Sequence, residues 1–275
     1  MTDATANDET LLARLVRGLG GVPGIRAIVL GGSRARGHAS ARSDYDIGLY
    51  YEPDNPIDVG RLAKAALLLP CAAGCEVTAI GEWGPWINGG AWLTVDGTRV
   101  DLLYRDLGKV RAVIEACRAG RIERVYQPGH PHAFVSAIYM GEVAMCRSLW
   151  DPENVLTPLK RQCDPYPPAL GEALIRSFFW EARFALENAG RGRGREDANY
   201  VAGCSFRSVA CLCQALFAHN RVYLLNEKGA VAQVERLGVK PADFADRVRR
   251  ALADGAAGLP ALMALVAETA SLLKA

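Results

Sequence analysis

Two aspartates separated by one residue carry the strongest chemical signal in this chain. Asp44 and Asp46 lie in the run Ser43-Asp44-Tyr45-Asp46-Ile47, which has the pattern of an apolar strand. Side chains at i and i+2 of a strand point to the same face, so the two carboxylates share one patch. At about 4 Å and an effective dielectric of about 20, such a pair costs roughly 4 kcal/mol unless one acid is protonated or cations neutralise it. Because oxygen ligands favour Mg²⁺ or Mn²⁺, we expect a divalent metal site here.

A third carboxylate, Asp101, fits the same site. The residues Val95-Asp96-Gly97-Thr98 have the composition of a hairpin turn, which places Asp101 inside the apolar strand that follows. An unpaired carboxylate buried in such a strand would be costly. Coordination to the same metal ions would remove that cost, so we predict that Asp44, Asp46 and Asp101 are metal ligands.

A glycine turn precedes the aspartates. Gly31 and Gly32 allow the backbone to approach a ligand closely, and Ser33 adds a hydroxyl donor. A short helix opening at Ser33 would direct free N–H groups at a phosphate. The segment lacks the Lys-Ser/Thr ending of a P-loop and the G-x-G-x-x-G spacing of a dinucleotide site. Phosphoryl or nucleotidyl transfer is the chemistry that these features suit.

These elements, in this order, resemble the signature of the DNA polymerase β-like nucleotidyltransferase superfamily. The likeness is strongest to its small bacterial members that modify aminoglycoside and lincosamide antibiotics, and it covers residues 25 to 105. It implies that Asp44, Asp46 and Asp101 are catalytic residues that hold two Mg²⁺ ions. Gly48 departs from the pattern, in which apolar residues usually continue the strand, but it leaves the acids in place.

The resemblance also implies an activity. Gly32, Ser33 and Arg36 would bind the phosphates of a nucleoside triphosphate, most simply ATP. The enzyme would transfer the nucleoside monophosphate to an acceptor hydroxyl and release pyrophosphate. A small molecule, possibly an antibiotic, is the expected acceptor.

Glu142 is a candidate general base. It lies in a strongly apolar helical run, residues 137 to 144, where a lone acid needs a partner or a task. Kanamycin-modifying relatives place a general-base glutamate on a helix after the catalytic domain. The alternative is a structural ion pair with a residue such as Arg147.

Lys228, in Asn226-Glu227-Lys228-Gly229, is a candidate ligand of the triphosphate. The alternative is a helix C-cap, with Gly229 at C′ and Lys228 complementing the helix dipole. The sequence favours the capping interpretation slightly.

Several other features have both a functional and a structural interpretation. The glycine-rich aromatic loop at residues 83 to 90 could stack on a base or sugar, or form a packed corner. The basic run from Arg191 to Arg195 is more typical of a solvated loop than of a nucleic-acid contact. The histidines lack the spacing of a metal site: His38, His130, His132 and His219. The eight cysteines lack paired C-x-x-C motifs, so we expect reduced, small apolar side chains.

The periodicity predicts an α+β protein with two domains. Residues 1–106 are predicted to form a mixed-sheet nucleotidyltransferase domain, and residues 107–275 a helical substrate-binding domain. The first has predicted helices at 8 to 19 and 57 to 69, strands at 25 to 30, 44 to 51 and 76 to 80, and the hairpin at 91 to 104. The second has predicted helices at 107 to 119, 132 to 150, 168 to 189, 197 to 219 and 244 to 253.

Composition restricts the partners. The chain has 275 residues, half of them hydrophobic, and a formal charge of +2, which provides no global field for holding long nucleic acid. We find no signal-peptide pattern and no apolar stretch of 18 residues, so we expect a cytoplasmic protein without a membrane partner. Three other functions stay open: adenylylation of a partner protein, addition of nucleotides to an RNA end, and nucleotide-dependent regulation without catalysis.

Overall fold

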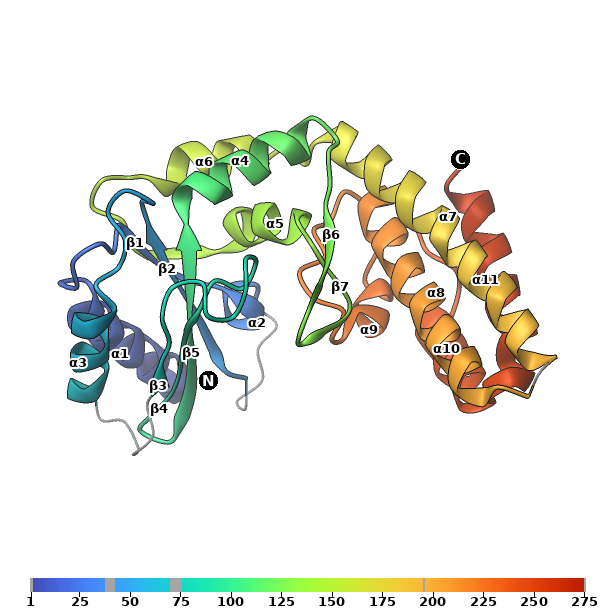
Figure 1. Cartoon of the computed structure of the whole chain (residues 1–275), viewed down its shortest axis with the longest axis horizontal. Helices are drawn as coiled ribbons and strands as arrows, with labels where there is room; N and C mark the ends of the chain where they lie inside the picture. Colours follow the sequence, from blue (N-terminus) through green and yellow to red (C-terminus); the bar gives the residue numbers. More distant parts are fainter. Residues whose placement is uncertain (1, 38–42, 70–75, 195, 275) are drawn as a thin grey trace. The chain divides into compact units, whose positions relative to one another are not determined.

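The chain is divided into two units in the computed structural model (Figure 1). The structure describes residues 2–37, 43–69, 76–194 and 196–274, with side chains from residue 10 onward. The first unit comprises Met1–Ile114 and Glu142–Asp164, and the second comprises Glu115–Gly141 and Pro165–Ala275. The protein is α+β, with a mixed sheet in the first unit and mainly helices in the second, as the sequence predicts.

A six-stranded mixed sheet forms the first unit, in the order β3-β4-β5-β2-β1-β8. β2 and β5 are parallel, and the other neighbours are antiparallel. The predicted hairpin is confirmed, because Asp96 and Gly97 both have positive φ, at 48° and 75°, as its two-residue turn requires. The strands are β1 (Ala27–Leu30), β2 (Tyr45–Tyr51), β3 (Glu76–Val77), β4 (Gly90–Val95), β5 (Thr98–Asp106) and β8 (Arg147–Trp150).

One face of this sheet is buried under two helices, α1 (Thr2–Leu19) and α3 (Val59–Leu68). Leu15 of α1 and Leu62 of α3 are fully buried against it. In β2, the alternate residues Tyr45, Ile47 and Leu49 join this core. The residues between them therefore point to the opposite face, and Asp46 is one of these.

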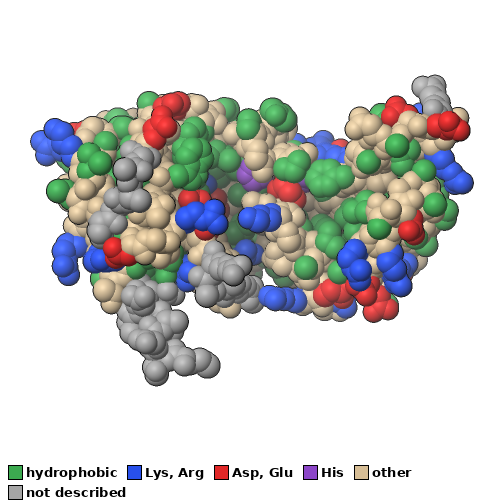
Figure 2. All heavy atoms as spheres, turned by 90° about the horizontal axis from the view of Figure 1, so that it is seen from below, with side chains coloured by type: hydrophobic (Ala, Val, Ile, Leu, Met, Phe, Trp, Pro, Cys, Tyr) green, Lys and Arg blue, Asp and Glu red, His purple; other side chains and the backbone are tan. Residues whose placement is uncertain are grey.

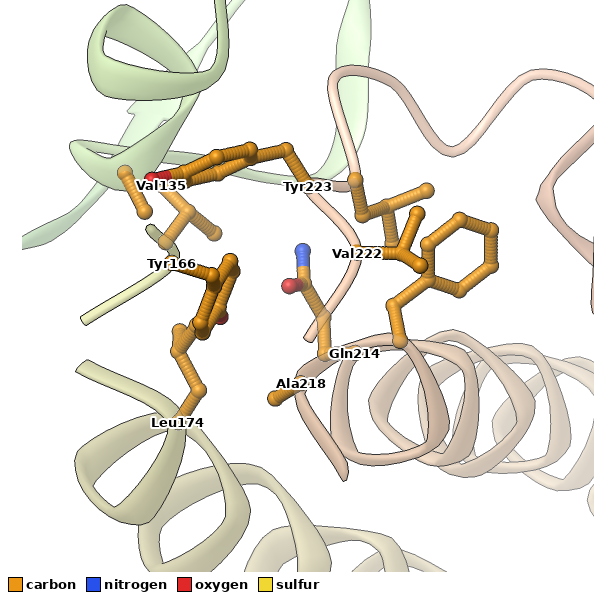
Figure 3. A pocket seen from close by; sticks show the side chains of 10 residues that line it. Val135, Tyr166, Leu174, Gln214, Ala218, Val222 and Tyr223 are labelled. Carbon is orange, nitrogen blue, oxygen red and sulfur yellow. The ribbon is translucent and has the colours of Figure 1, made fainter. Parts of the chain in front are cut away.

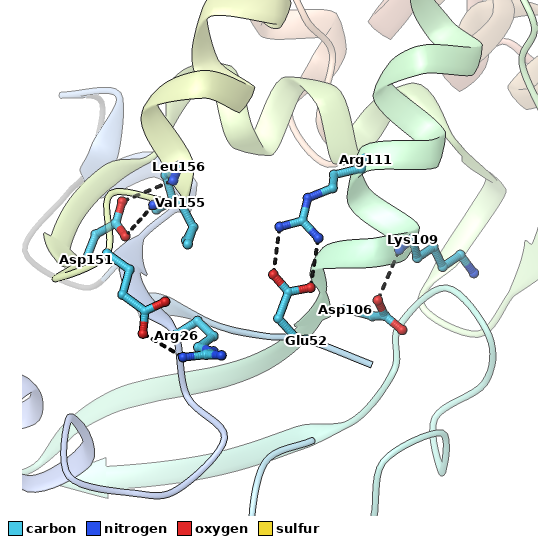
Figure 4. A network of polar contacts seen from close by, with 9 residues as sticks. Arg26, Glu52, Asp106, Lys109, Arg111, Asp151, Val155 and Leu156 are labelled. Atoms are coloured by element: carbon cyan, nitrogen blue, oxygen red, sulfur yellow. Dashed lines mark hydrogen bonds and ion pairs between the residues drawn. The ribbon is translucent and has the colours of Figure 1, made fainter. Parts of the chain in front are cut away.

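One ion pair joins the later segment Glu142–Asp164 to the residue before β1, and further hydrogen bonds lie within the segment (Figure 4). Arg26, which precedes β1, pairs with Glu153 at 2.5 Å. The Asp151 carboxylate accepts hydrogen bonds from the amides of Val155 and Leu156, where α6 (Leu156–Cys163) begins. The short helix α2 (Gly32–Ala35) follows β1.

The second unit consists of a hairpin and a set of helices. Its hairpin joins β6 (Arg124–Gln127) and β7 (His130–Val135), and its two longest helices pack along one another (Figure 1). These are α7 (Pro168–Arg193) and α8 (Ala198–His219), and they are followed by α9 (Ala230–Val234), α10 (Phe244–Ala253), a 3₁₀ turn (Gly255–Gly258) and α11 (Leu259–Leu272). Two helices cross the divisions between the units: α4 (Leu107–Arg118) and α5 (Ala137–Met145).

The prediction of one helix at residues 132 to 150 is wrong. This stretch contains part of β7, then α5, and then β8, which pairs with β1. His132 and Phe134 are buried in β7 while Pro131 is exposed, which is the alternation of a strand. The division into units also differs from the predicted boundary after residue 106, because β8 and α6 return to the first unit.

Two stretches among the described residues are long and apolar enough to cross a membrane by length and composition, Ala198–His219 and Gly255–Leu272. The distribution of apolar residues in the sequence predicts no such stretch. The apolar window of the first stretch is 72% buried inside the protein, and that of the second is 33% buried. A buried core helix of a soluble protein passes the same test. Because α8 packs along α7, its length and apolar composition are only weak evidence of a membrane span.

The charged surface and the cysteines are as the low net charge and the cysteine spacing predict. On the face shown in Figure 2, the coloured side chains of both charge signs are interspersed. Six cysteines are free in the described part of the chain, and five of these are buried: Cys117, Cys146, Cys163, Cys211 and Cys213. Cys71, Cys75 and His38 lie outside the described residues.

Candidate active site

The strand register brings two of the predicted aspartates together. Asp46 of β2 and Asp101 of β5 are direct partners in the parallel pair, so their side chains share the face of the sheet that α1 and α3 leave uncovered. The glycine turn lies beside Asp46, because the Gly31 amide donates to the Asp46 carbonyl at 2.7 Å. The prediction from residue spacing therefore places Asp46 and Asp101 correctly as neighbours.

Asp46 lies in an excess of negative charge. Its pKa is raised from the usual 3.8 to about 6, first by burial and then by the carboxylates of Asp101, Glu142 and Asp44, in that order. The guanidinium of Arg36 acts in the opposite direction. A carboxylate in such surroundings gains from a bound cation, which would favour its charged form.

Asp44 has a different environment. It lies one residue before β2, and its Oδ1 pairs with Nε of Arg99 at 3.0 Å. Within the described residues, no group of three or more His, Cys, Asp or Glu side chains is placed to hold a metal ion. Two of the three predicted ligands are thus register partners, while the third is paired with arginine.

The glycine turn is shaped around Asp46. Gly32 begins α2 with φ of 60°, a backbone conformation that residues other than glycine rarely adopt. A Cβ on Gly32 would lie 1.7 Å from Asp46 Oδ2, so glycine is required both for the backbone conformation and for the carboxylate. Ser33 follows in the short helix that the sequence predicts, and Arg36 donates to the Gly32 carbonyl at 3.2 Å.

Glu142 forms an ion pair, and its partner is Arg105 and not Arg147. Nε and Nη2 of Arg105 donate to the two carboxylate oxygens at 2.7 Å each. The Arg105 side chain is 4% exposed and that of Glu142 is 25% exposed. Arg147 lies in the edge strand β8. This geometry supports the structural interpretation of Glu142, although its charge still acts on Asp46.

The predicted surroundings of Lys228 are wrong. The segment before it is irregular, and Gly229, with φ of 76°, precedes α9 instead of ending a helix. The Lys228 amide donates to Asn226 Oδ1 at 2.7 Å, while its side chain is exposed in the second unit. The adjacent Glu227 pairs with His130 at 3.1 Å.

The aromatic loop is largely a packed corner, with one exception. Trp86 is buried under the ammonium of Lys109, which lies 3.9 Å from its ring centroid. Trp83 instead stacks on Trp92 of β4, with ring centroids 4.3 Å apart and planes at 22°. Trp92 is 62% exposed and was not singled out from the sequence.

The remaining sequence candidates lie in the second unit. His132 is buried in β7, and its Nδ1 lies 2.9 Å from an Arg207 nitrogen. The pKa of His132 is lowered to about 4, first by burial and then by the charge of Arg207, so this histidine is neutral at ordinary pH. Arg191 belongs to the end of α7 and bonds Asn188, while Arg195 lies outside the described residues.

The second unit also contains a small, mainly apolar pocket (Figure 3). The amide of Gln214, from α8, projects into it between Tyr166 and Val222. The other lining residues are Val135, Ala137, Leu174, Phe217, Ala218, Tyr223 and Leu224. Since Gln214 is only 7% exposed, the pocket surrounds a buried amide.

Comparisons with known proteins give little further information. No protein-family description matches the chain, and no curated protein is found to match it. Among solved structures, it is similar to a nucleotidyltransferase-like protein from Exiguobacterium sibiricum 255-15, with 11% identity and a TM-score of 0.38. The match covers 96% of this chain and 78% of the other. A likeness at that level supports no inference about shared function.

Proposed function

We propose that this protein is a metal-dependent nucleotidyltransferase that transfers a nucleoside monophosphate, most simply AMP from ATP, to a hydroxyl of a small molecule. The observation that carries the proposal is the pairing of Asp46 with Asp101 in adjacent strands, next to the Gly31–Gly32 turn. An antibiotic is the first acceptor class to test, because the sequence motif resembles antibiotic-modifying enzymes.

The donor set has the right chemistry for a divalent cation. Asp46 and Asp101 supply oxygen ligands in adjacent strands, and the carboxylates of Asp101, Glu142 and Asp44 that act on Asp46 outnumber the Arg36 guanidinium. Asp44 would join them after leaving Arg99. When bound, such an ion would stabilise the negative charge that develops on the transferring phosphoryl group.

The chain's own residues would bind and orient the reactants. The turn at Gly32 lets the backbone lie directly against the Asp46 carboxylate, and Ser33 and Arg36 would provide a hydroxyl and a guanidinium for phosphate oxygens. In the reaction, the acceptor oxygen bonds to the α-phosphorus, the bond from that phosphorus to the bridging oxygen breaks, and pyrophosphate leaves. The hydroxyl proton passes to solvent or to a carboxylate.

Glu142 and Lys228 have secondary places in the proposal. Glu142 is bound by Arg105 on both oxygens, so it serves better to position Arg105 and to shape the charge around Asp46 than to accept a proton. Lys228 stays a candidate triphosphate ligand without a supporting contact.

A transfer assay tests the proposal. The protein is incubated with Mg²⁺ and ATP labelled at the α-phosphate, together with a panel of hydroxyl-bearing antibiotics, and products are separated by charge. We expect label on at least one acceptor and its loss by at least about 100-fold in Asp46→Asn and Asp101→Asn. Asp54→Asn, an exposed aspartate after β2, is the matched control. Equal transfer by all four proteins would refute the assignment.

A further inference from the structure

A stacked pair of tryptophans, one of them exposed, lies beside Asp101. Trp92 is 62% exposed although it lies within a strand, and Trp83 stacks on it from the preceding loop. We refer to Trp83 and Trp92 as the indole pair. Within β4, the neighbours of Trp92 on either side, Ala91 and Leu93, are buried, so Trp92 faces away from the core under α1 and α3. The opposite sheet face therefore displays a large aromatic surface to solvent.

The register places carboxylates on both sides of Trp92. Glu76 of β3 is its partner on one side, and Asp101 of β5 is its partner on the other. Direct partners have side chains on the same face, and adjacent strands are about 4.8 Å apart. Asp46 is the next partner in the same row. Four strands thus present Glu76, Trp92, Asp101 and Asp46 in sequence across one face.

This combination has a specific ligand chemistry. An indole face attracts a cation through its ring quadrupole, most strongly when the cation is partly desolvated. Carboxylates on both sides add attraction for positive charge and would repel an anion. An organic cation with an apolar body therefore complements the surface better than a neutral aromatic ring does.

We propose that the indole pair and Glu76 bind an ammonium group of the small molecule on which the enzyme acts. The proposal rests on the proposed function, since it assigns this row to the acceptor. The aromatic surface would hold the apolar part of the molecule, and Glu76, on the side of Trp92 away from Asp101, would lie beside its charge. A hydroxyl of the same molecule would then lie along the row toward Asp46.

Binding of model cations tests the subsite without nucleotide or metal. Benzyltrimethylammonium and the neutral benzyl alcohol are titrated into the full chain, and the indole N–H signals are followed by NMR. We expect saturable binding of the cation at millimolar concentrations, at least about 5-fold tighter than the alcohol, and weaker in 0.5 M salt. Trp92→Ala and Glu76→Gln should each weaken cation binding by about 3-fold or more.

Matched variants separate this effect from unfolding and from general charge. Trp180→Ala removes a tryptophan of the same 62% exposure in the second unit, and Glu172→Gln removes an exposed acid of α7, so both should bind the cation normally. Trp92→Phe keeps an aromatic face and should retain most of the binding. Melting curves of all variants verify that they are folded.

Two results would overturn the subsite. Equal affinity for the cation and the alcohol would show an apolar contact without charge recognition. A Trp92→Ala protein that binds the cation normally but binds Mg-ATP more weakly would assign the indole pair to the nucleobase. Because these titrations contain no ATP, failure of the subsite is distinguishable from failure of nucleotidyl transfer, which the labelled-ATP assay measures separately.

Discussion

Replacing Asp46 with asparagine should stabilise the protein while abolishing its activity. In the folded state, the pKa of Asp46 is about 6, against an ordinary value of 3.8. At about 1.36 kcal/mol per pKa unit, the difference corresponds to about 3 kcal/mol of destabilisation at pH 7. Partial exposure of the carboxylate reduces this to about 1–3 kcal/mol. Asparagine has nearly the same shape without the charge, so it should recover much of that free energy.

The sign of the pH dependence provides the stringent test. An acid whose pKa is raised on folding binds its proton more tightly in the folded state, so it destabilises the protein as pH rises from about 4 to 6. The gain of Asp46→Asn should therefore be complete above pH 6 and vanish near pH 4. Urea unfolding at pH 4, 5, 6 and 7.5, without metal, measures this.

Two comparisons complete the experiment. Asp54→Asn should change stability by less than about 0.5 kcal/mol at every pH, because its carboxylate is exposed. Millimolar Mg²⁺ should stabilise the wild-type protein more than Asp46→Asn, since a ligand that binds the folded state raises the free energy of unfolding. A loss of stability at pH 7 in Asp46→Asn, or a gain independent of pH, would refute the electrostatic account of the site.

Three further predictions concern the surrounding framework. Gly32→Ala should destabilise the chain more than Gly37→Ala in urea unfolding and should weaken Mg-ATP binding, because both glycines have positive φ but only Gly32 would place a Cβ against Asp46. Arg105→Ala should lower the free energy of unfolding by about 3–5 kcal/mol, because Glu142 would lose its buried partner. Arg111→Ala, which breaks the more exposed pair with Glu52, should lower it by only about 0–1 kcal/mol. Equal losses of stability would contradict a buried role for Arg105. The imidazole of His132 should stay neutral to about pH 4 in an NMR titration, and the stability that depends on it should be present above about pH 6.5 and lost as pH falls toward 4.

The strands and the turn around the candidate site were predictable because their signals are local. Because side chains alternate between the two faces of a strand, the apolar neighbours of Asp46 determine the face on which it lies. The two-residue turn of Asp96 and Gly97 determines where the strand that carries Asp101 begins. Gly32 was identified by its type, and its contact with Asp46 explains why glycine is needed. These inferences required only the residues next to each position.

The parts that were missed depend on distant pairings. Residues 132 to 150 are apolar enough to suit either a helix or strands, and only the pairing of β8 with β1 decides between them. Arg105 lies 37 positions from Glu142, so no local pattern predicts their ion pair, although Arg105 shares the strand face of Asp101. The position of Trp92 between Glu76 and Asp101 likewise follows from the strand register.

The interrupted course of the first unit has a consequence for how the protein is made. The chain leaves that unit after Ile114 and returns at Glu142, so β8 reaches its place beside β1 only after more than a hundred residues have been synthesised. Until then the outer edge of β1 has unpaired backbone groups, which can pair with other chains. During translation, the nascent chain must therefore keep an open sheet edge through the synthesis of the β6–β7 hairpin. A fragment ending at residue 106 would keep that edge permanently, whereas one ending at Asp164 would include the closing strand and should aggregate less.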